Sequence, residues 1–189
     1  MTDGTPSLAT REGLPEALRV LLERYPRAAW EADPGFSHLI RFWLDRHILF
    51  RQLLDRLTTD AERMLDGDTE AERYGRLLSR FGGMFVGELH THHTVEDTRF
   101  FPVLSQKDLR LSAGFDLLDA DHHALDAQLE ELTARANTVL QSDPAGHATA
   151  TGRLHKTLTG FAPLLNRHLL DEEDLIVPVL LAHGDAGLP

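Results

Sequence analysis

Two stretches of the sequence carry histidine and glutamate at the same spacing. His92 is followed by Glu96, and His168 is followed by Glu172. In both stretches an acidic residue follows the glutamate, and Pro-Val-Leu begins ten residues after the histidine. Residues four apart lie one turn apart on the same face of a helix, so each pair can bind one metal ion. The repetition favours a metal site over isolated structural histidines.

Each pair is preceded by a further histidine on an apolar helical stripe. His47 lies 45 residues before His92, and His122 lies 46 residues before His168. Four imidazoles and two carboxylates suit two metal ions if each carboxylate bridges both ions, and the absence of sulfur favours iron or manganese over structural zinc. The candidate metal ligands are therefore His47, His92, Glu96, His122, His168 and Glu172.

Composition excludes several other functions. The chain has no Cys, which excludes disulfides, thiolate zinc sites and iron–sulfur clusters. The formal charge of −11 disfavours nucleic-acid binding, because phosphate backbones are repelled. The sequence lacks a long apolar run and a signal-peptide pattern at its start, so we expect no membrane span and a cytoplasmic location.

Apolar spacings of three and four predict an all-α protein, an antiparallel up-down four-helix bundle with a short extra N-terminal helix. We expect an N-terminal extension over residues 1–36, the bundle over 37–182 and a frayed tail over 183–189. The predicted helices cover residues 14–24, 37–64, 70–104, 113–140 and 148–181, with a loop at 26–36. Pro102 should bend or end the third of these, while Gly160 and Pro163 should distort the last.

Several side chains near the candidate ligands allow two interpretations. His122 is preferred to His123 as a ligand because it shares the stripe of Leu118, Leu125 and Leu129, whereas His123 shares a face with acidic residues. Asp97, Asp171 and Glu173 either orient the ligands or lie in solvent. Phe81, Phe85, Phe100 and Phe101 are expected in the core. A metal-free bundle with hydrogen-bonded histidines is the alternative to the whole site.

The sequence resembles the hemerythrin-like family, also called the HHE cation-binding domain. The resemblance is carried by His47 in Leu-Asp-Arg-His, His92-His-Thr-Val-Glu96-Asp-Thr-Arg-Phe-Phe-Pro, Asp121-His122 and His168-Leu-Leu-Asp-Glu172-Glu. It implies two non-haem iron ions, oxo- or hydroxo-bridged, with manganese or zinc less suitable. Members of the family bind oxygen, sense oxygen or iron, act on peroxide or nitric oxide, or supply iron for repair.

The chain departs from the oxygen-carrying hemerythrins in the helix that holds His122. Those proteins have His-x3-His there, whereas Leu118 and Asp126 stand four residues either side of His122. His93 could restore a fifth imidazole. The lost ligand favours reaction with a small oxidant (oxygen, peroxide or nitric oxide) over reversible oxygen carriage. An iron- or oxygen-sensing or iron-handling module without catalysis is the alternative function.

Overall fold

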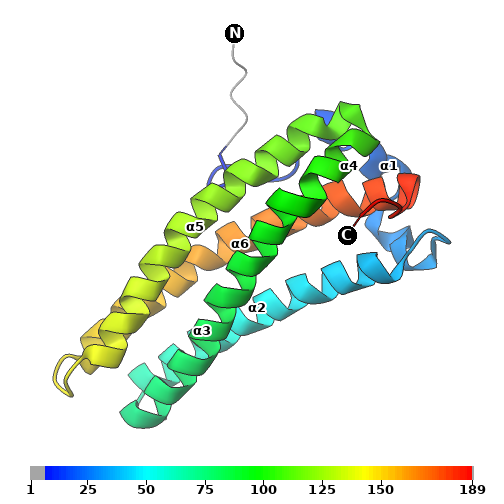
Figure 1. Cartoon of the computed structure of the whole chain (residues 1–189). Helices are drawn as coiled ribbons and strands as arrows, with labels where there is room; N and C mark the ends of the chain where they lie inside the picture. The colour runs from blue at the N-terminus through cyan, green and yellow to red at the C-terminus, as the bar shows by residue number, and fades with distance from the viewer. Residues whose placement is uncertain (1–6, 189) are drawn as a thin grey trace. The chain divides into compact units, whose positions relative to one another are not determined.

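The computed structural model describes residues 7–188, and within that range the chain is helical without strands (Figure 1). The α-helices are α1 (Val20–Arg24), α2 (His38–Leu65), α3 (Ala71–Val95), α4 (Phe101–Lys107), α5 (Ser112–Gln141) and α6 (His147–His183). Short 3-10 helices are η1 (Glu16–Leu18), η2 (Arg27–Ala32) and η4 (Leu109–Leu111), and η3 (Glu96–Phe100) is a π-helix. The all-α prediction is confirmed, while the antiparallel bundle topology stays a prediction.

The chain forms two compact units. The first unit comprises the described residues of Met1–His47, His93–Ala124 and Asn166–Pro189. The second comprises Ile48–His92 and Leu125–Leu165. The four long helices α2, α3, α5 and α6 each contribute residues to both units. The candidate ligands other than His92 fall in the first unit.

The ends of α2 follow from its flanking residues. The Ser37 hydroxyl accepts a hydrogen bond from the Ile40 amide at 3.4 Å, which satisfies one of the amides that a helix start leaves without a partner. After α2 the backbone turns at Gly67, whose φ of 81° is readily adopted only by glycine. Both boundaries agree with the prediction for this helix.

Three details of the predicted elements were wrong. The helix expected over residues 14–24 is split into η1 and α1, and the loop expected over 26–36 contains η2. The last helix, α6, continues without interruption through Gly160 and Pro163. A proline inside a helix costs about 3 kcal/mol, but the buried residues Phe161 and Leu165 flank Pro163 and hold this part of α6 in place.

The chain stays helical on both sides of Pro102, but the turn before the proline is a π-helix instead of an α-helix. Pro102 has no N–H to donate to the carbonyl of residue 98, and its ring would collide with that carbonyl in a regular α-helix. The wider turn of η3, from Glu96 to Phe100, precedes it, and α4 continues to Lys107. A π-turn of this kind is frequent at functional sites. Here it begins at Glu96, one of the candidate ligands.

The apolar core of the first unit includes the N-terminal segment. Leu14, Leu18, Leu21 and Trp30 are buried in one cluster with side chains from α2, α4, η4, α5 and α6. The other members of this cluster are Ile40, Trp43, Phe101, Leu104, Leu111, Phe115, Leu118, Leu175, Ile176, Val177, Val179 and Leu180. Residues 14–30 are therefore structurally part of the first unit.

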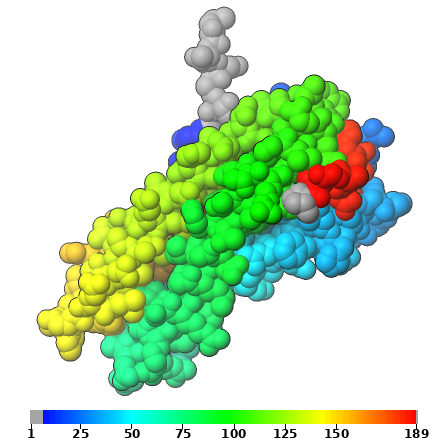
Figure 2. All heavy atoms as spheres, viewed as in Figure 1, coloured from blue at the N-terminus to red at the C-terminus, as the bar shows by residue number. Residues whose placement is uncertain are grey.

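The C-terminal residues lie against α4 in the first unit. Lys107 donates a hydrogen bond from Nζ to the Ala186 carbonyl at 2.9 Å. Figure 2 shows this contact region, with the red C-terminal residues beside the green side chains of α4. The backbone turns after α6 at Gly184 and Gly187, which have φ values of 70° and 86°.

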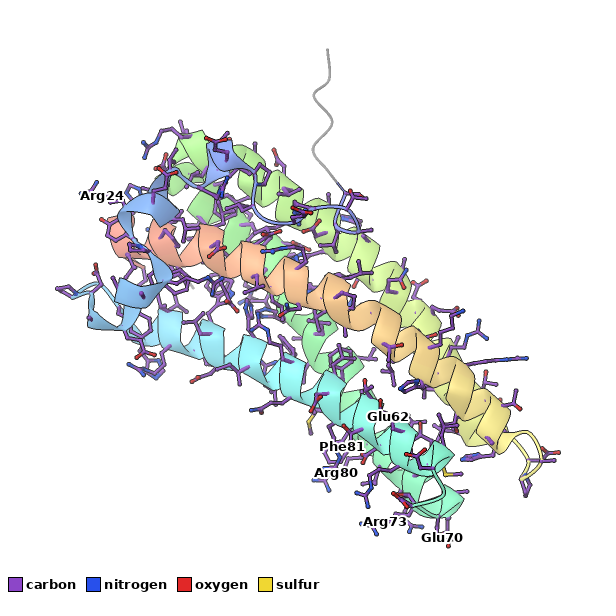
Figure 3. The ribbon with its side chains drawn as sticks, turned by 180° about the vertical axis from the view of Figure 1, so that it is seen from behind. Arg24, Glu62, Glu70, Arg73, Arg80 and Phe81 are labelled. Carbon is purple, nitrogen blue, oxygen red and sulfur yellow. The ribbon has the colours of Figure 1, made fainter. Side chains whose placement is uncertain are left out.

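In the second unit, aromatic residues fill the space between helices. Phe85 of α3 and Phe161 of α6 are fully buried, with ring centroids 6.0 Å apart. Phe81 is only half-buried, so its expected place in the core was wrong. The guanidinium groups of Arg56 and Arg80 lie over its ring at 4.9 and 5.4 Å, and Figure 3 labels Phe81 and Arg80 together on this surface. No helix in residues 7–188 is both long and apolar enough to span a membrane.

Candidate metal centre

Three buried histidines from three helices meet in the first unit. His93 lies at the end of α3, His122 in α5 and His168 in α6. The rings of His93 and His122 are stacked with centroids 4.0 Å apart, and His168 is edge-on to both, at 5.4 and 4.8 Å. One ring nitrogen of each lies within 4.8 Å of the others, which is close enough for one metal ion to bind all three.

A second group in the same unit combines histidine with carboxylates. Donor atoms of His47, Glu96 and Glu172 lie within 4.8 Å of one another, and all three side chains are at most 1% exposed. Carboxylate in a closed apolar setting is costly unless it is paired or metal-bound. This group therefore has the composition of a cation site.

Glu172 lies between the two groups. Its Oε1 is 3.3 Å from Nε2 of His47, and its Oε2 is 3.3 Å from Nε2 of His168. Trp43 donates its indole N–H to Oε1 of the same carboxylate. Oε2 of Glu96 lies 3.5 Å from Nε2 of His122. Each glutamate of the repeated pair thus approaches a histidine from another helix.

In three of these histidines, a carboxylate lies next to Nδ1, the ring nitrogen that does not face the other candidate ligands. Nδ1 of His47 is 2.9 Å from Oε1 of Glu173, and Nδ1 of His122 is 2.7 Å from Oδ1 of Asp97. Nδ1 of His168 is 3.5 Å from Oδ2 of Asp121. A carboxylate at Nδ1 favours the tautomer that carries its proton there and leaves Nε2 available to a metal ion.

The electrostatics of the site suit a bound cation. Burial alone would lower the pKa of His168, but Asp121 and Glu172 raise it to about 9. Burial likewise opposes the rise in the pKa of His47, which Glu172 causes. Burial raises the pKa of Glu96 well above its ordinary value, and the charge of Glu172 adds to this effect. The carboxylates thus repel each other and attract positive charge.

The donor set fits a metal ion. Nε2 of His122 and Nε2 of His168 are buried and face carboxylate oxygens of Glu96 and Glu172 at 3.5 and 3.3 Å. A cation placed between these nitrogens and oxygens would be attracted by both kinds of donor. Imidazole and carboxylate together are typical ligands of iron.

A family model for the hemerythrin HHE cation-binding domain matches residues 38–180. The chain belongs to the hemerythrin HHE cation-binding family. The resemblance inferred from the repeated pairs is thereby confirmed. No curated protein and no solved structure matches the chain. Together with the buried histidine and glutamate groups, membership of the family indicates that this domain binds metal cations, typically iron.

The other histidines considered from the sequence differ in burial and position within this HHE domain. His93 is 2% exposed and belongs to the three-histidine group, although its sequence position marked it only as a possible addition. His92 is the last residue of the second unit, is half-buried, and precedes Glu96 by four residues in the chain. The His123 side chain is 78% exposed, which agrees with the preference for His122.

The acidic neighbours left open between two interpretations are now placed. Asp97 and Glu173 contact the histidines directly. Asp171 is fully buried and accepts hydrogen bonds from Arg11 at 2.7 Å and from Arg167 at 2.6 Å. All three therefore lie in the polar network around the ligands rather than in solvent.

Two residues of the site, Trp43 and Asp121, were given no role at the site from the sequence. Trp43 precedes His47 by four residues, and a tryptophan on an apolar stripe needs a partner for its N–H, so the partner could have been sought among the ligands. Asp121 directly precedes His122, but nothing in its spacing pointed to His168, which is 47 residues away.

Proposed function

We propose that this HHE domain holds two iron ions and binds or reduces a small oxidant: oxygen, peroxide or nitric oxide. The observation that carries the proposal is the position of Glu172, whose two oxygens approach His47 in one group and His168 in the other. A carboxylate placed in this way can bridge two cations, and a single cation would use only one of its sides.

The proposed ligands divide between the two groups. His122 and His168 serve one ion with His93 as the additional imidazole, and His47 serves the other ion, while His92 stays a ligand predicted from its spacing to Glu96. Glu96 and Glu172 bridge. The group of His47 then has fewer protein donors than the three-histidine group, and this is the position where a small molecule would have room to bind.

Bound iron would supply electrons and an open coordination position for the oxidant. The protein's own side chains would keep water away and hold the ligands still. Phe101 packs on the His122 ring with centroids 5.4 Å apart, and Phe100 packs edge-on against Trp43 at 4.8 Å. Trp43 and Glu173 fix Glu172 and His47 by hydrogen bonds. Such fixed donors need no reorganisation during a reaction.

The experiment is an anaerobic Fe(II) titration of the purified protein, followed by addition of peroxide or nitric oxide. We expect two irons per chain and consumption of at least one of these oxidants. The double variant E96A/E172A should bind fewer than one iron. A matched control, E70A/E130A, removes two exposed glutamates and should retain both irons.

Two results would change the proposal. Retention of two irons by E96A/E172A would refute bridging by these glutamates. Iron binding that raises helicity or protease resistance, with no oxidant consumed, would instead favour the non-catalytic iron-handling module.

A further inference from the structure

The N-terminal segment, residues 7–36, lies outside the family match yet contacts the metal centre. It contributes four apolar side chains to the core of the first unit, and the match begins only at residue 38. Figure 3 shows the blue N-terminal segment running along α6. Two arginines from this segment, Arg11 and Arg27, reach the carboxylates around the ligands.

Arg11 joins α5 to α6 beneath the three-histidine group. Its side chain is 2% exposed. Nε donates to Oδ2 of Asp171 at 2.7 Å, and the two terminal nitrogens donate to both oxygens of Asp121. Oδ2 of Asp121 is the atom that faces Nδ1 of His168. A continuous chain of polar contacts thus runs from Arg11 through Asp121 to a ligand.

Arg27 makes the equivalent connection to the other group. Its Nη1 donates to Oε2 of Glu173 at 2.7 Å, while Oε1 of the same carboxylate lies 2.9 Å from Nδ1 of His47. Nε and Nη2 bind Asp174 and the Leu170 carbonyl at 2.7 and 2.9 Å. The guanidinium therefore contacts residues about one turn apart on α6 and fixes the carboxylate that holds His47.

We propose that Arg11 and Arg27 are positioning residues of the metal centre. Each fixes a carboxylate that in turn fixes Nδ1 of a ligand, so that His168 and His47 present Nε2 toward the metal. The planar fork of arginine suits this task because it binds a carboxylate through two parallel hydrogen bonds. Loss of such outer contacts typically weakens metal binding 10- to 100-fold. The inference rests on the proposed iron site.

A purely structural role for the two ion pairs predicts something different. Buried Asp121 and Asp171 need a cation whether or not a metal is bound, so removal of Arg11 would lower stability in either case. A structural role would leave the iron affinity of the folded protein unchanged. Arg27 separates the two roles better than Arg11, because its side chain is 39% exposed, whereas that of Arg11 is 2% exposed.

The test is Fe(II) affinity of the full chain, measured anaerobically by competition with a chromophoric chelator. R11Q and R27Q should each bind iron 10- to 100-fold more weakly, and R11K, which keeps the charge without the fork, should recover only part of the loss. R19Q, which removes an exposed arginine of the same segment, is the control and should match the wild type. Thermal unfolding of each metal-free variant reports stability separately.

A second measurement reports the hydrogen bonds of the histidine ligands directly. In the Co(II)-substituted protein, the exchangeable imidazole N–H signals shifted by the metal should change in R11Q and R27Q but not in R19Q. Wild-type iron affinity and unchanged N–H signals in a folded R27Q or R11K would overturn the positioning role while leaving the iron site intact. Failure of the wild type to bind iron would overturn the proposed function and this inference together.

Discussion

His122 and His123 are neighbours in the chain with opposite environments. The His122 side chain is 2% exposed, and its Nδ1 is held by Asp97, whereas His123 is 78% exposed. Replacing His122 by Ala should therefore remove a ligand and reduce iron from two to about one per chain, because the affected group keeps only two imidazoles. Iron content of protein purified under excess Fe(II) measures this.

The matched control is His123→Ala, which should keep full iron content and the wild-type melting temperature. Equal iron content in the two variants would show that the three-histidine group does not bind metal through His122.

Asp108 and Arg110 form an ion pair that we expect to stabilise the fold independently of the metal centre. The Arg110 guanidinium lowers the pKa of Asp108 to about 2, with a smaller opposing effect of burial. A carboxyl group whose folded pKa is depressed stabilises the fold above its unfolded pKa, near 3.9, and loses this contribution as the pH falls toward 2. The difference in unfolding free energy between wild type and Asp108→Asn should therefore shrink between pH 5 and pH 2.

Chemical denaturation of both metal-free proteins across this range gives the difference directly. A constant difference from pH 5 to pH 2 would mean that Asp108 acts through its shape and its cap on η4 alone, not through its charge.

The sequence pointed to candidate ligands more directly than to the residues that contact them. Spacing of four residues pointed to His92 with Glu96 and His168 with Glu172 because helical geometry is local. The contact of Arg11 with Asp171 joins residues 160 apart, and no periodicity encodes such a contact. Glu173 could be suspected only because it follows a ligand directly.

At the scale of elements, one glycine sets how closely α5 and α6 approach within the first unit. A Cβ added at Gly114 would lie 2.7 and 2.9 Å from the Leu175 methyl groups. Gly114→Ala should destabilise the protein by about 1 kcal/mol, because overpacking costs about 1–3 kcal/mol and exceeds the small gain in helix propensity near the start of α5. Urea denaturation measures the change.

Gly152→Ala is the control, because a Cβ there meets no atom within 4 Å and the residue lies inside α6. That variant should be up to about 1 kcal/mol more stable. The double variant Gly114→Ala with Leu175→Val should regain part of the lost stability. Destabilisation of both single variants alike would contradict the close approach.

Some helix boundaries could be predicted from neighbouring residues alone. Ser37 and Gly67 delimit α2 as expected, since caps and turns depend on adjacent residues. Pro102 was correctly identified as a disturbance, but the sequence could not distinguish a break from a π-turn. The outcome depends on whether the free energy gained by burying Phe101 and Leu104 exceeds the cost of continuing the helix past the proline.

At the scale of the whole molecule, iron should stabilise mainly the first unit. A ligand that binds only the folded state adds about 2.7 kcal/mol at a free concentration of 100 Kd. Hydrogen exchange with and without iron should therefore show added protection in residues 93–124 and 166–183, with smaller changes in 48–91 and 125–165. Exchange measured by mass spectrometry after chelation resolves the two sets.

Equal protection in both units would show that the whole chain unfolds as one cooperative body in either state. Unchanged exchange in both units, with iron demonstrably bound, would contradict the expected stabilisation of the first unit.

The contact between Arg11 and Asp171 also bears on when the centre can form. Arg11 is synthesised 160 residues before its partner Asp171. At about 5–20 residues per second, the interval is roughly ten to thirty seconds. A nascent chain that ends after α5 would have His47, Glu96 and His122 but neither His168 nor Glu172. The proposed iron site is therefore complete only after Glu172 has been synthesised, and chains truncated before His168 should leave the ribosome as apoprotein.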